Sequence, residues 1–409
     1  MEENLIKSEF KLKLTVLVLA ISIPLNLNFA NAAVKAGSAC SKVGSKSASG
    51  GKSYTCVKSG KKLVWDKGVL VPAAQPSPSA SASASASASA SPSLTPKASV
   101  APAVVYPKGP TGFDDLIENY QGISYAAWSK SSAVIKGASD AAPTFKAVTG
   151  PNTTLAFKNP ASAFELVSRL YTGYETAKDF TVLSFSFNDR DWATQQMKTI
   201  QANSNYPWIT GMACASRETC WGGGVFTDEK ASELLVLTTE ILDDNHTTGT
   251  LEAHGFTHVI QQNQMRGPQP WPTTGNWPTT WYLEGQAEFS QNAAIFYQSF
   301  DQYSKNRRSV SDGLFKDSTI TAQWIQDFLS SNQDSSWFSK YESWRQYDVG
   351  GMFVEALVAI KGPTSTMEVW KQCGSGMKFP DAFEKVYGIS FAKALPIISK
   401  AIALEIGRS

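Results

Sequence analysis

The pattern of apolar and polar positions marks the start of the chain as different from the rest. An apolar run from Leu14 to Leu25 follows two lysines and precedes the small residues Ala30 and Ala32, which is the pattern of an export signal. We therefore expect residues 1–32 to be a cleaved signal peptide. The run is shorter than the roughly 20 apolar residues that cross a bilayer. The pattern predicts a secreted or cell-envelope-associated protein with no transmembrane segment after cleavage.

From Tyr106 onward the pattern predicts strands first and helices afterwards. Four early stretches have such patterns: they predict strands at 152–157 and 180–187, and helices at 161–171 and 191–202. A glycine-rich run after Cys220 indicates a turn into an edge strand, and helical spacing dominates from Thr248. This order favours an α+β fold. We expect a mixed α/β part at 106–245 and a helical part at 246–409.

Two further segments precede this body. Residues 71–105 consist mainly of Pro, Ser and Ala, a composition that cannot bury a core and predicts a disordered linker. Residues 33–70 form a small module, in which Gly50-Gly51 predicts a hairpin turn and Leu63–Trp65 a short strand. The module resembles a small N-terminal element of secreted actinobacterial proteins.

The charge is distributed unevenly along the chain. The formal net charge is +2, but residues 34–70 carry eight lysines and one acid, while residues 101–409 carry a net charge of −6. A body of this kind excludes nucleic-acid binding, which requires a strongly basic domain. The basic module predicts either attachment to an anionic cell-envelope polymer or simply a well-solvated surface, and its composition leaves both open.

The five cysteines fit an oxidising compartment. Cys40 and Cys56 lie in the basic module, and Cys214 and Cys220 lie six residues apart. We expect each pair to form a disulfide, which leaves Cys373 unpaired.

The histidines supply the candidate chemistry. All three fall within thirteen residues, at His246, His254 and His258. His254 and His258 are four apart in a helical pattern, which places both imidazoles on one face, one turn apart, as in a Zn²⁺ site. The pair alone also fits two histidines packed in a core. We expect His246 to lie at the surface or beside a ligand rather than to bind metal.

A carboxylate follows at a suitable place. Glu284 stands 26 residues after His258 in a second helical pattern, WYLEGQAEF, and a Pro-, Gly- and Trp-rich loop between them reverses the chain. Two antiparallel helices would deliver Glu284 as a third ligand. Glu288, one turn further along, would accept the outward N–H of a ligating histidine.

These blocks resemble a known family. HGFTHVIQ and WYLEGQAEF, with YDVGGMFVEALVAIKGPTSTMEVW and FPDAFEKVYGISF further on, are similar to the gluzincin type of zinc metallopeptidase, over roughly residues 250–405. The resemblance implies a zincin-like fold, Zn²⁺ ligands at His254, His258 and Glu284, and a peptide or protein ligand. No glycine-rich phosphate loop with its lysine is present, so no organic cofactor is expected.

The departure from the family pattern concerns the catalytic base. In HExxH the glutamate polarises the zinc-bound water and carries its proton, but here that position is Gly255. Glu252 is a weak substitute, because it lies three residues earlier and outside the usual line. Tyr347 matches a residue that donates to the oxyanion in several gluzincins, although a role as an aromatic packing residue explains it better.

Three functions therefore remain open. The first is an exported pseudopeptidase that binds zinc or a peptide-like ligand without efficient hydrolysis. The second is an active metallohydrolase with a non-standard base. The third is a cell-envelope binding protein in which the basic module and the aromatic-rich body bind and the histidines have no catalytic role.

Overall fold

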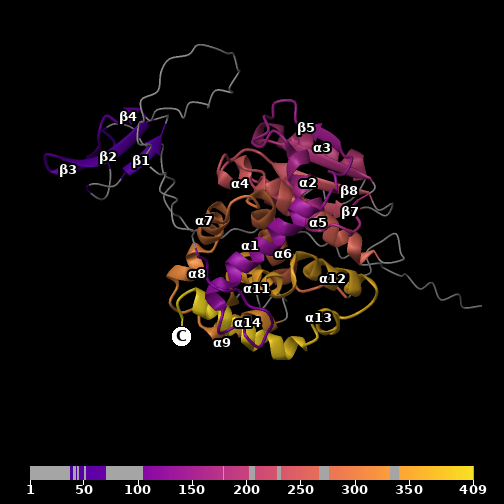
Figure 1. Ribbon diagram of the computed structural model, residues 1–409. Coiled ribbons are helices and arrows are strands. Elements are labelled where there is room, and N and C mark those ends of the chain that lie inside the picture. The colour runs from indigo at the N-terminus through magenta and orange to yellow at the C-terminus, as the bar shows by residue number, and fades with distance from the viewer. Residues whose placement is uncertain are drawn as a thin grey trace, which may run out of the picture. The chain divides into compact units, whose positions relative to one another are not determined.

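The chain divides into two compact units, which are described separately (Figure 1). The computed structural model describes residues 37–39, 43, 46–49, 52–70, 105–177, 179–201, 208–227, 232–266, 276–331 and 340–408. The predicted signal peptide, almost all of the predicted linker and Cys40 lie outside the described residues. One unit comprises Leu25–Ala103; the other comprises Met1–Pro24 with Val104–Ser409.

The smaller unit is a four-stranded antiparallel sheet. Its strands are β1 Lys46–Ser49, β2 Lys52–Ser59, β3 Lys62–Trp65 and β4 Val69–Leu70. Strand β2 pairs with each of the other three. The pairing of Ser49 with Lys52 agrees with the hairpin predicted at Gly50-Gly51, and the predicted short strand lies within β3. Cys56 is buried and disulfide-bonded.

The larger unit contains one sheet, in the order β5, β6, β8, β7. The strands are β5 Lys146–Thr149, β6 Phe180–Phe185, β7 Gly223–Thr227 and β8 Glu233–Thr238. The first three strands in this order run parallel, and β7 pairs antiparallel with β8 at the edge. The predicted edge strand is thus β7. It follows the Cys214–Cys220 disulfide, which is present as expected.

The strand predicted at 152–157 is wrong. These residues form a turn and bends. Both oxygens of the Asp189 carboxylate accept hydrogen bonds here, from the backbone and side-chain amides of Asn152, each at 2.9 Å, and from the hydroxyl of Thr153 at 2.6 Å. Side chains that bond in this way hold the backbone in a turn and compete with a strand ladder.

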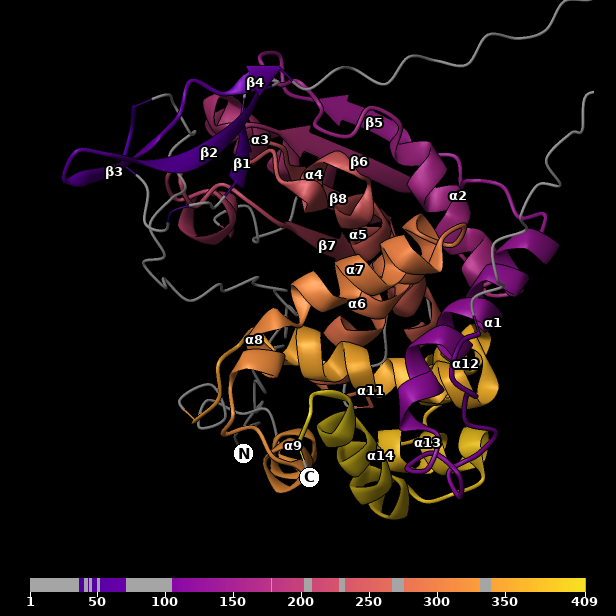
Figure 2. The same ribbon diagram turned by 60° about the vertical axis from the view of Figure 1, so that its left-hand side comes forward.

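Helices make up the rest of the larger unit. They are α1 Ile123–Gly137, α2 Pro160–Leu170, α3 Arg190–Gln201, α4 Asp244–Thr247, α5 Thr250–Met265, α6 Thr280–Ile295, α7 Phe300–Val310, α8 Asp312–Lys316, α9 Ala322–Ser330, α11 Arg345–Lys361, α12 Pro363–Gly374, α13 Phe379–Tyr387 and α14 Phe391–Glu405. The mixed α+β fold with a helical second half is therefore confirmed. Figures 1 and 2 show the sheet at one end of this unit and α13 and α14 at the other, with α5 and α6 between them.

In the part of the chain that the structure describes, no single helix has the length and apolar character to cross a membrane. Only α13 and α14 meet that test when taken as one pair, and they are bent by 75° relative to each other.

Two glycines set the spacing of the helices around the candidate site. A Cβ on Gly285 of α6 would lie 2.2 Å from the backbone carbon of Gly350 in α11. A Cβ on Gly350 would lie 2.2 Å from the carbonyl oxygen of Trp281. Neither backbone could come this close with a side chain in between. The two glycines therefore hold α6 and α11 in contact, next to Glu284.

Candidate metal centre

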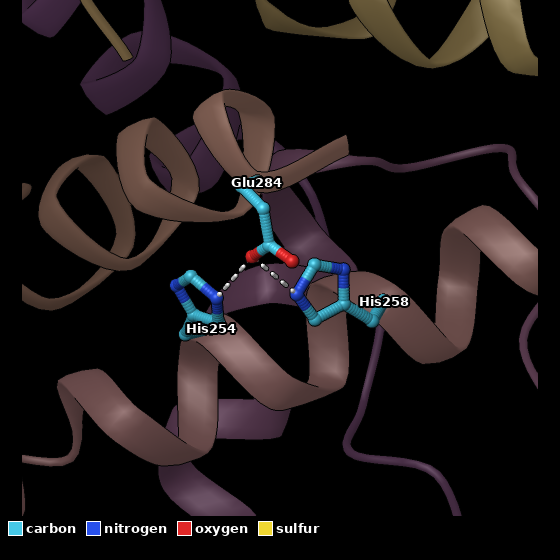
Figure 3. Close-up of side chains that lie close together, drawn as sticks. All are labelled: His254, His258 and Glu284. Carbon is cyan, nitrogen blue, oxygen red and sulfur yellow. Dashed lines mark hydrogen bonds and ion pairs between the residues drawn. The ribbon is translucent and has the colours of Figure 1, made fainter. Parts of the chain in front are cut away.

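Three side chains from two helices converge in the interior of the larger unit. His254 and His258 extend from α5 and Glu284 extends from α6, and all three point into one space (Figure 3). Their ligand atoms lie within 4.8 Å of one another. The Nε2 atoms of His254 and His258 lie 3.3 Å and 3.4 Å from Oε2 of Glu284. The structure thus brings together the three residues that the sequence indicates as metal ligands.

The helical spacing explains this geometry. All 16 residues of α5 are buried, because the helix packs against β7 and β8 on one side and against α2, α6 and α12 on others. A four-residue separation places both imidazoles on the face toward α6. Glu284 reaches them because α6 packs directly against α5. The ligand positions therefore rest on helix packing and not on a loop.

Two of the three separations between donor atoms match a zinc ion. Zinc binds nitrogen and oxygen ligands at about 2.0–2.2 Å in tetrahedral geometry, which separates neighbouring ligand atoms by about 3.3–3.6 Å. The two histidine–carboxylate distances fall at that value. In addition, Nε2 of His258 is buried without a hydrogen-bond partner among the described residues. Two neutral imidazoles and one carboxylate form a suitable donor set for Zn²⁺.

The electrostatics of His254 and Glu284 suit a metal ion. Burial lowers the pKa of His254, which favours the neutral imidazole that a metal needs. Burial alone would raise the pKa of Glu284, but the neighbouring His258 and His254 outweigh it and bring the pKa to about 2. Glu284 therefore remains a carboxylate.

The space next to the ligands is narrow and apolar. It has a volume of about 10 Å³ and is lined by Gly223, Gly224, Val225, Leu237, Leu251, His254, Gly255, His258 and Glu284. A cavity of this size holds about one water molecule or one ion. The three ligands expose 6%, 3% and 1% of their surface. The three donor groups are therefore largely buried, and the space beside them is small.

The position of the missing base is occupied by another side chain. A Cβ on Gly255 would lie 2.5 Å from Cδ1 of Leu235, which extends from β8 and is fully buried. A real Cβ does not approach a carbon atom this closely. Leu235 therefore fills the place into which the side chain of a glutamate at 255 would begin to extend.

Glu252 does not lie where it could replace this base. It precedes His254 by two residues, which places it about 160° around the helix, and it is absent from the described residues that line the cavity. Its Oε2 is buried without a hydrogen-bond partner among the described residues. Burial raises the pKa of this carboxyl to about 7.

Glu288 and Tyr347 lie on the other side of His254. Oε2 of Glu288 is 3.9 Å from Nδ1 of His254, on the predicted side but beyond hydrogen-bond distance. Burial raises the Glu288 pKa to about 8. The Tyr347 ring lies 5.9 Å from the His254 ring and stacks on Trp344 at 4.8 Å. Its buried hydroxyl has no hydrogen-bond partner among the described residues, so both packing and a donor role remain open to it.

His246 stands apart from the ligand cluster. Among the described residues the cluster contains only His254, His258 and Glu284. His246 is 3% exposed, so a surface position is wrong, and its Nδ1 lies 2.6 Å from Oδ1 of Asp243.

Two residues of the site were not identified in the sequence analysis. Gln261 lies 2.7 Å from Nδ1 of His258 through its Oε1. Its place three residues after His258 on one helix is a local signal that could have indicated the contact. Leu235 belongs to a strand that the sequence analysis did not predict, and no local signal connects it with Gly255.

The comparisons with known proteins add no assignment. Neither models of protein families, nor curated proteins, nor solved structures give a significant match to this chain. The functional argument therefore rests on the residues of the site.

Proposed function

We propose that the chain is a zincin-like protein that holds one zinc ion through His254, His258 and Glu284 without catalysing efficient peptide hydrolysis. The donor types, the two histidine–carboxylate distances and the Nε2 of His258, which has no hydrogen-bond partner among the described residues, support the metal. When bound, zinc would supply a Lewis acid at this point. The described residues that line the adjoining cavity would leave room for about one water molecule, and position 255 would offer no group to accept a proton from it.

The observation that carries the non-catalytic part of the proposal is the contact between Gly255 and Leu235. A general base must lie within hydrogen-bond reach of the proton that it removes. Position 255 has no side chain, and the aliphatic side chain of Leu235 fills the space beside its Cα. Losing a general base typically lowers a rate by about 10²–10⁴-fold. The small cavity and the burial of the three ligands lower access to the centre as well.

A peptide-like ligand remains compatible with the strand next to the site. Strand β7 is the edge of its sheet, and Gly223 and Gly224 line the cavity. An edge strand offers unpaired backbone groups to an extended chain. We therefore propose a peptide or protein segment as the ligand, bound along β7 next to the metal.

Metal content tests this proposal. The full chain, freed of metal and titrated with Zn²⁺, is expected to bind one equivalent. His258→Gln and Glu284→Gln are expected to lose it, whereas His246→Gln, which changes the one histidine outside the cluster, is the matched control and should retain it. Failure of the natural protein to bind zinc, with the fold intact by circular dichroism, would overturn the proposal.

An active hydrolase with another base is less well supported. Glu252 lies on a different face of α5 from the two histidines, and Tyr347 is a buried phenol whose pKa is raised well above its usual value, first by burial. A phenol of this kind can donate a hydrogen bond but does not remove a proton near neutral pH. Zinc-dependent hydrolysis by the natural protein at the rate of a base-restored variant would favour this alternative.

The smaller unit supports a second candidate function, binding to an anionic envelope polymer. Lys58, Lys61 and Lys62 are exposed around the turn between β2 and β3. Asp66 is the single acid of residues 34–70, and its Oδ1 accepts from the backbone amides of Thr55 at 3.0 Å and Gly68 at 2.9 Å. Because the Asp66 carboxylate is hydrogen-bonded to these backbone amides and not to a described lysine, the positive charge of the three lysines is largely uncompensated.

Binding of the full chain to long-chain polyphosphate, measured at low and at moderate salt, tests this second function. Changing Lys58, Lys61 and Lys62 to Gln should weaken binding, because counterion release scales with the number of contacting cations. The matched control changes Lys108, Lys136 and Lys393, three exposed lysines of the larger unit, and alters the net charge by the same amount. Equal weakening by both sets would show that only net charge matters.

Export remains part of the proposal. Cys214 and Cys220 form a disulfide, and Cys56 is disulfide-bonded. Disulfides persist in oxidising compartments and are rare in the reducing cytosol, which supports the predicted route out of the cell.

A further inference from the structure

We infer that Gln261 is a positioning residue that fixes the tautomer of His258, through a chain of buried hydrogen bonds that ends on α12. The inference deepens the proposed zinc site and rests on it for its effect on metal affinity. The geometry begins at the ligand: Nδ1 of His258 lies 2.7 Å from Oε1 of Gln261. Gln261 is fully buried, so no solvent competes for this contact.

The orientation of the Gln261 amide follows from its other contacts. Its Nε2 donates to the carbonyl oxygen of Leu283 at 3.0 Å and to Oε1 of Gln286 at 2.8 Å. A backbone carbonyl can only accept, so the amide nitrogen must face Leu283. The amide oxygen therefore faces His258, and it too can only accept. Consequently Nδ1 of His258 must carry the proton.

The next link fixes Gln286 in the same way. Its Nε2 donates to the hydroxyl oxygen of Thr366 at 2.7 Å, and that hydroxyl donates to the carbonyl of Pro363 at 2.7 Å. Since the Pro363 carbonyl is an acceptor only, the direction of donation is the same along the whole chain. Two backbone carbonyls, one on α6 and one on α12, thus determine which ring nitrogen of His258 is protonated.

The consequence lies at the other ring nitrogen. With the proton on Nδ1, a neutral His258 presents the Nε2 lone pair toward Oε2 of Glu284, 3.4 Å away. Two electron-rich atoms facing each other in a buried space repel unless a cation lies between them. The chain from Pro363 to His258 therefore prepares the site for a metal before it arrives. Outer contacts of this kind typically change metal affinity by about 10–100-fold.

The test compares two glutamines on the same helix. Gln261→Leu removes the acceptor for His258, whereas Gln264→Leu removes an amide of the same size that donates to the carbonyls of Glu175 and Ile260. Both side chains are buried, so both variants lose hydrogen bonds and packing of a similar kind. Zinc affinity, measured by competition with a chromophoric chelator on the full chain, should fall about 10–100-fold in Gln261→Leu and stay unchanged in Gln264→Leu.

A second readout does not depend on zinc. With only three histidines in the chain, ¹⁵N-labelled imidazoles can be assigned by NMR, and their ¹⁵N shifts distinguish Nδ1–H from Nε2–H. Metal-free natural protein should show His258 as Nδ1–H, and Gln261→Leu should lose that state. Gln261→Glu should restore it, because the carboxylate again accepts from Nδ1, although its second oxygen faces the Leu283 carbonyl and lowers stability.

The outcomes separate the two proposals. Retention of the Nδ1–H state and of full zinc affinity in Gln261→Leu would overturn the role of Gln261. If the natural protein binds no zinc, the proposed function fails, and the ¹⁵N signature of His258 still decides whether the chain of hydrogen bonds sets the tautomer. Should Gln261→Leu not fold, Gln261→Glu carries the test through the predicted retention of the tautomer at reduced stability.

Discussion

Restoring a carboxylate at position 255 requires two substitutions, because the contact with Leu235 stands in the way. A Cβ at 255 would lie 2.5 Å from Cδ1 of Leu235, whereas carbon atoms in contact are about 3.5–4.0 Å apart. The leucine must therefore move by about 1 Å or more. Overpacking of this kind costs about 1–3 kcal/mol, which offsets or exceeds the gain of about 0.5–1 kcal/mol from removing a helical glycine. Gly255→Glu alone should thus be destabilised and poorly placed.

The double variant Gly255→Glu/Leu235→Ala relieves this conflict. Leu235→Ala alone should cost about 2–5 kcal/mol, since it opens a cavity at a fully buried position. The glutamate side chain would occupy part of that cavity. We expect the pair to be more stable than the sum of the single changes, by a coupling of about 0.5–3 kcal/mol in urea unfolding. A coupling of zero would refute the steric reasoning.

Activity completes the test. Each protein is loaded with zinc and assayed for cleavage of a mixed library of fluorescence-quenched peptides, because the preferred sequence is not specified by the site. The double variant should exceed the natural protein by about 10²–10⁴-fold. Gly255→Gln/Leu235→Ala is the matched control, with the same shape and no base, and should remain inactive. A folded, zinc-loaded double variant without activity would refute the view that the contact between Gly255 and Leu235 separates this centre from a hydrolytic one.

Three further predictions follow from the structure. Removing zinc with a chelator should lower the melting temperature of the natural protein but not of His258→Gln, because a ligand at 1,000 times its Kd stabilises the folded state by about 4 kcal/mol. Gly350→Ala should lower both stability and zinc affinity, since its Cβ would meet the Trp281 carbonyl at 2.2 Å and push α6 away. A circular dichroism melt and a chelator competition check this; unchanged zinc affinity would contradict it. Burial raises the pKa of Asp348 to about 7 from an ordinary value of 3.8, so its stabilising effect is full below about pH 4 and is lost as the pH rises through 7. The difference in unfolding free energy between Asp348→Asn and the natural protein should therefore shift in favour of the variant between pH 4 and 7, and a pH-independent difference would contradict the assignment.

The parts of the site that depend on one helix could be predicted from the sequence. His254 and His258 belong to a single turn of α5, and their common face follows from helical periodicity alone. Predicting Glu284 as a ligand required two further signals, a loop that reverses the chain and a resemblance to a family pattern. The glycine contact that packs α6 against α11 involves positions 65 residues apart in the sequence, and no local pattern indicates it.

The sequence-based expectations that failed did so because contacts between residues distant in the sequence decided the local structure. Residues 152–157 have the apolar and β-branched composition of a strand, yet hydrogen bonds from Asn152 and Thr153 to the distant Asp189 hold them in a turn. The long-range polar contact with Asp189 therefore outweighs the local strand propensity of these residues. Similarly, Glu252 is close to Gly255 in sequence but faces another direction, whereas Leu235, twenty positions away, is the residue that touches it.

The glycine at 255 and the leucine at 235 are best understood as one structural feature. If Gly255 merely lacked a side chain, a glutamate-sized gap would remain beside the metal, and such a cavity would fill with water or bind small solutes. The space is instead packed, and the cavity that remains is only about 10 Å³. A packed, apolar wall next to a buried donor set limits the remaining space to about one ion or one water molecule. We therefore propose that the packing around position 255, together with the absence of a base there, favours retention of a metal over hydrolysis.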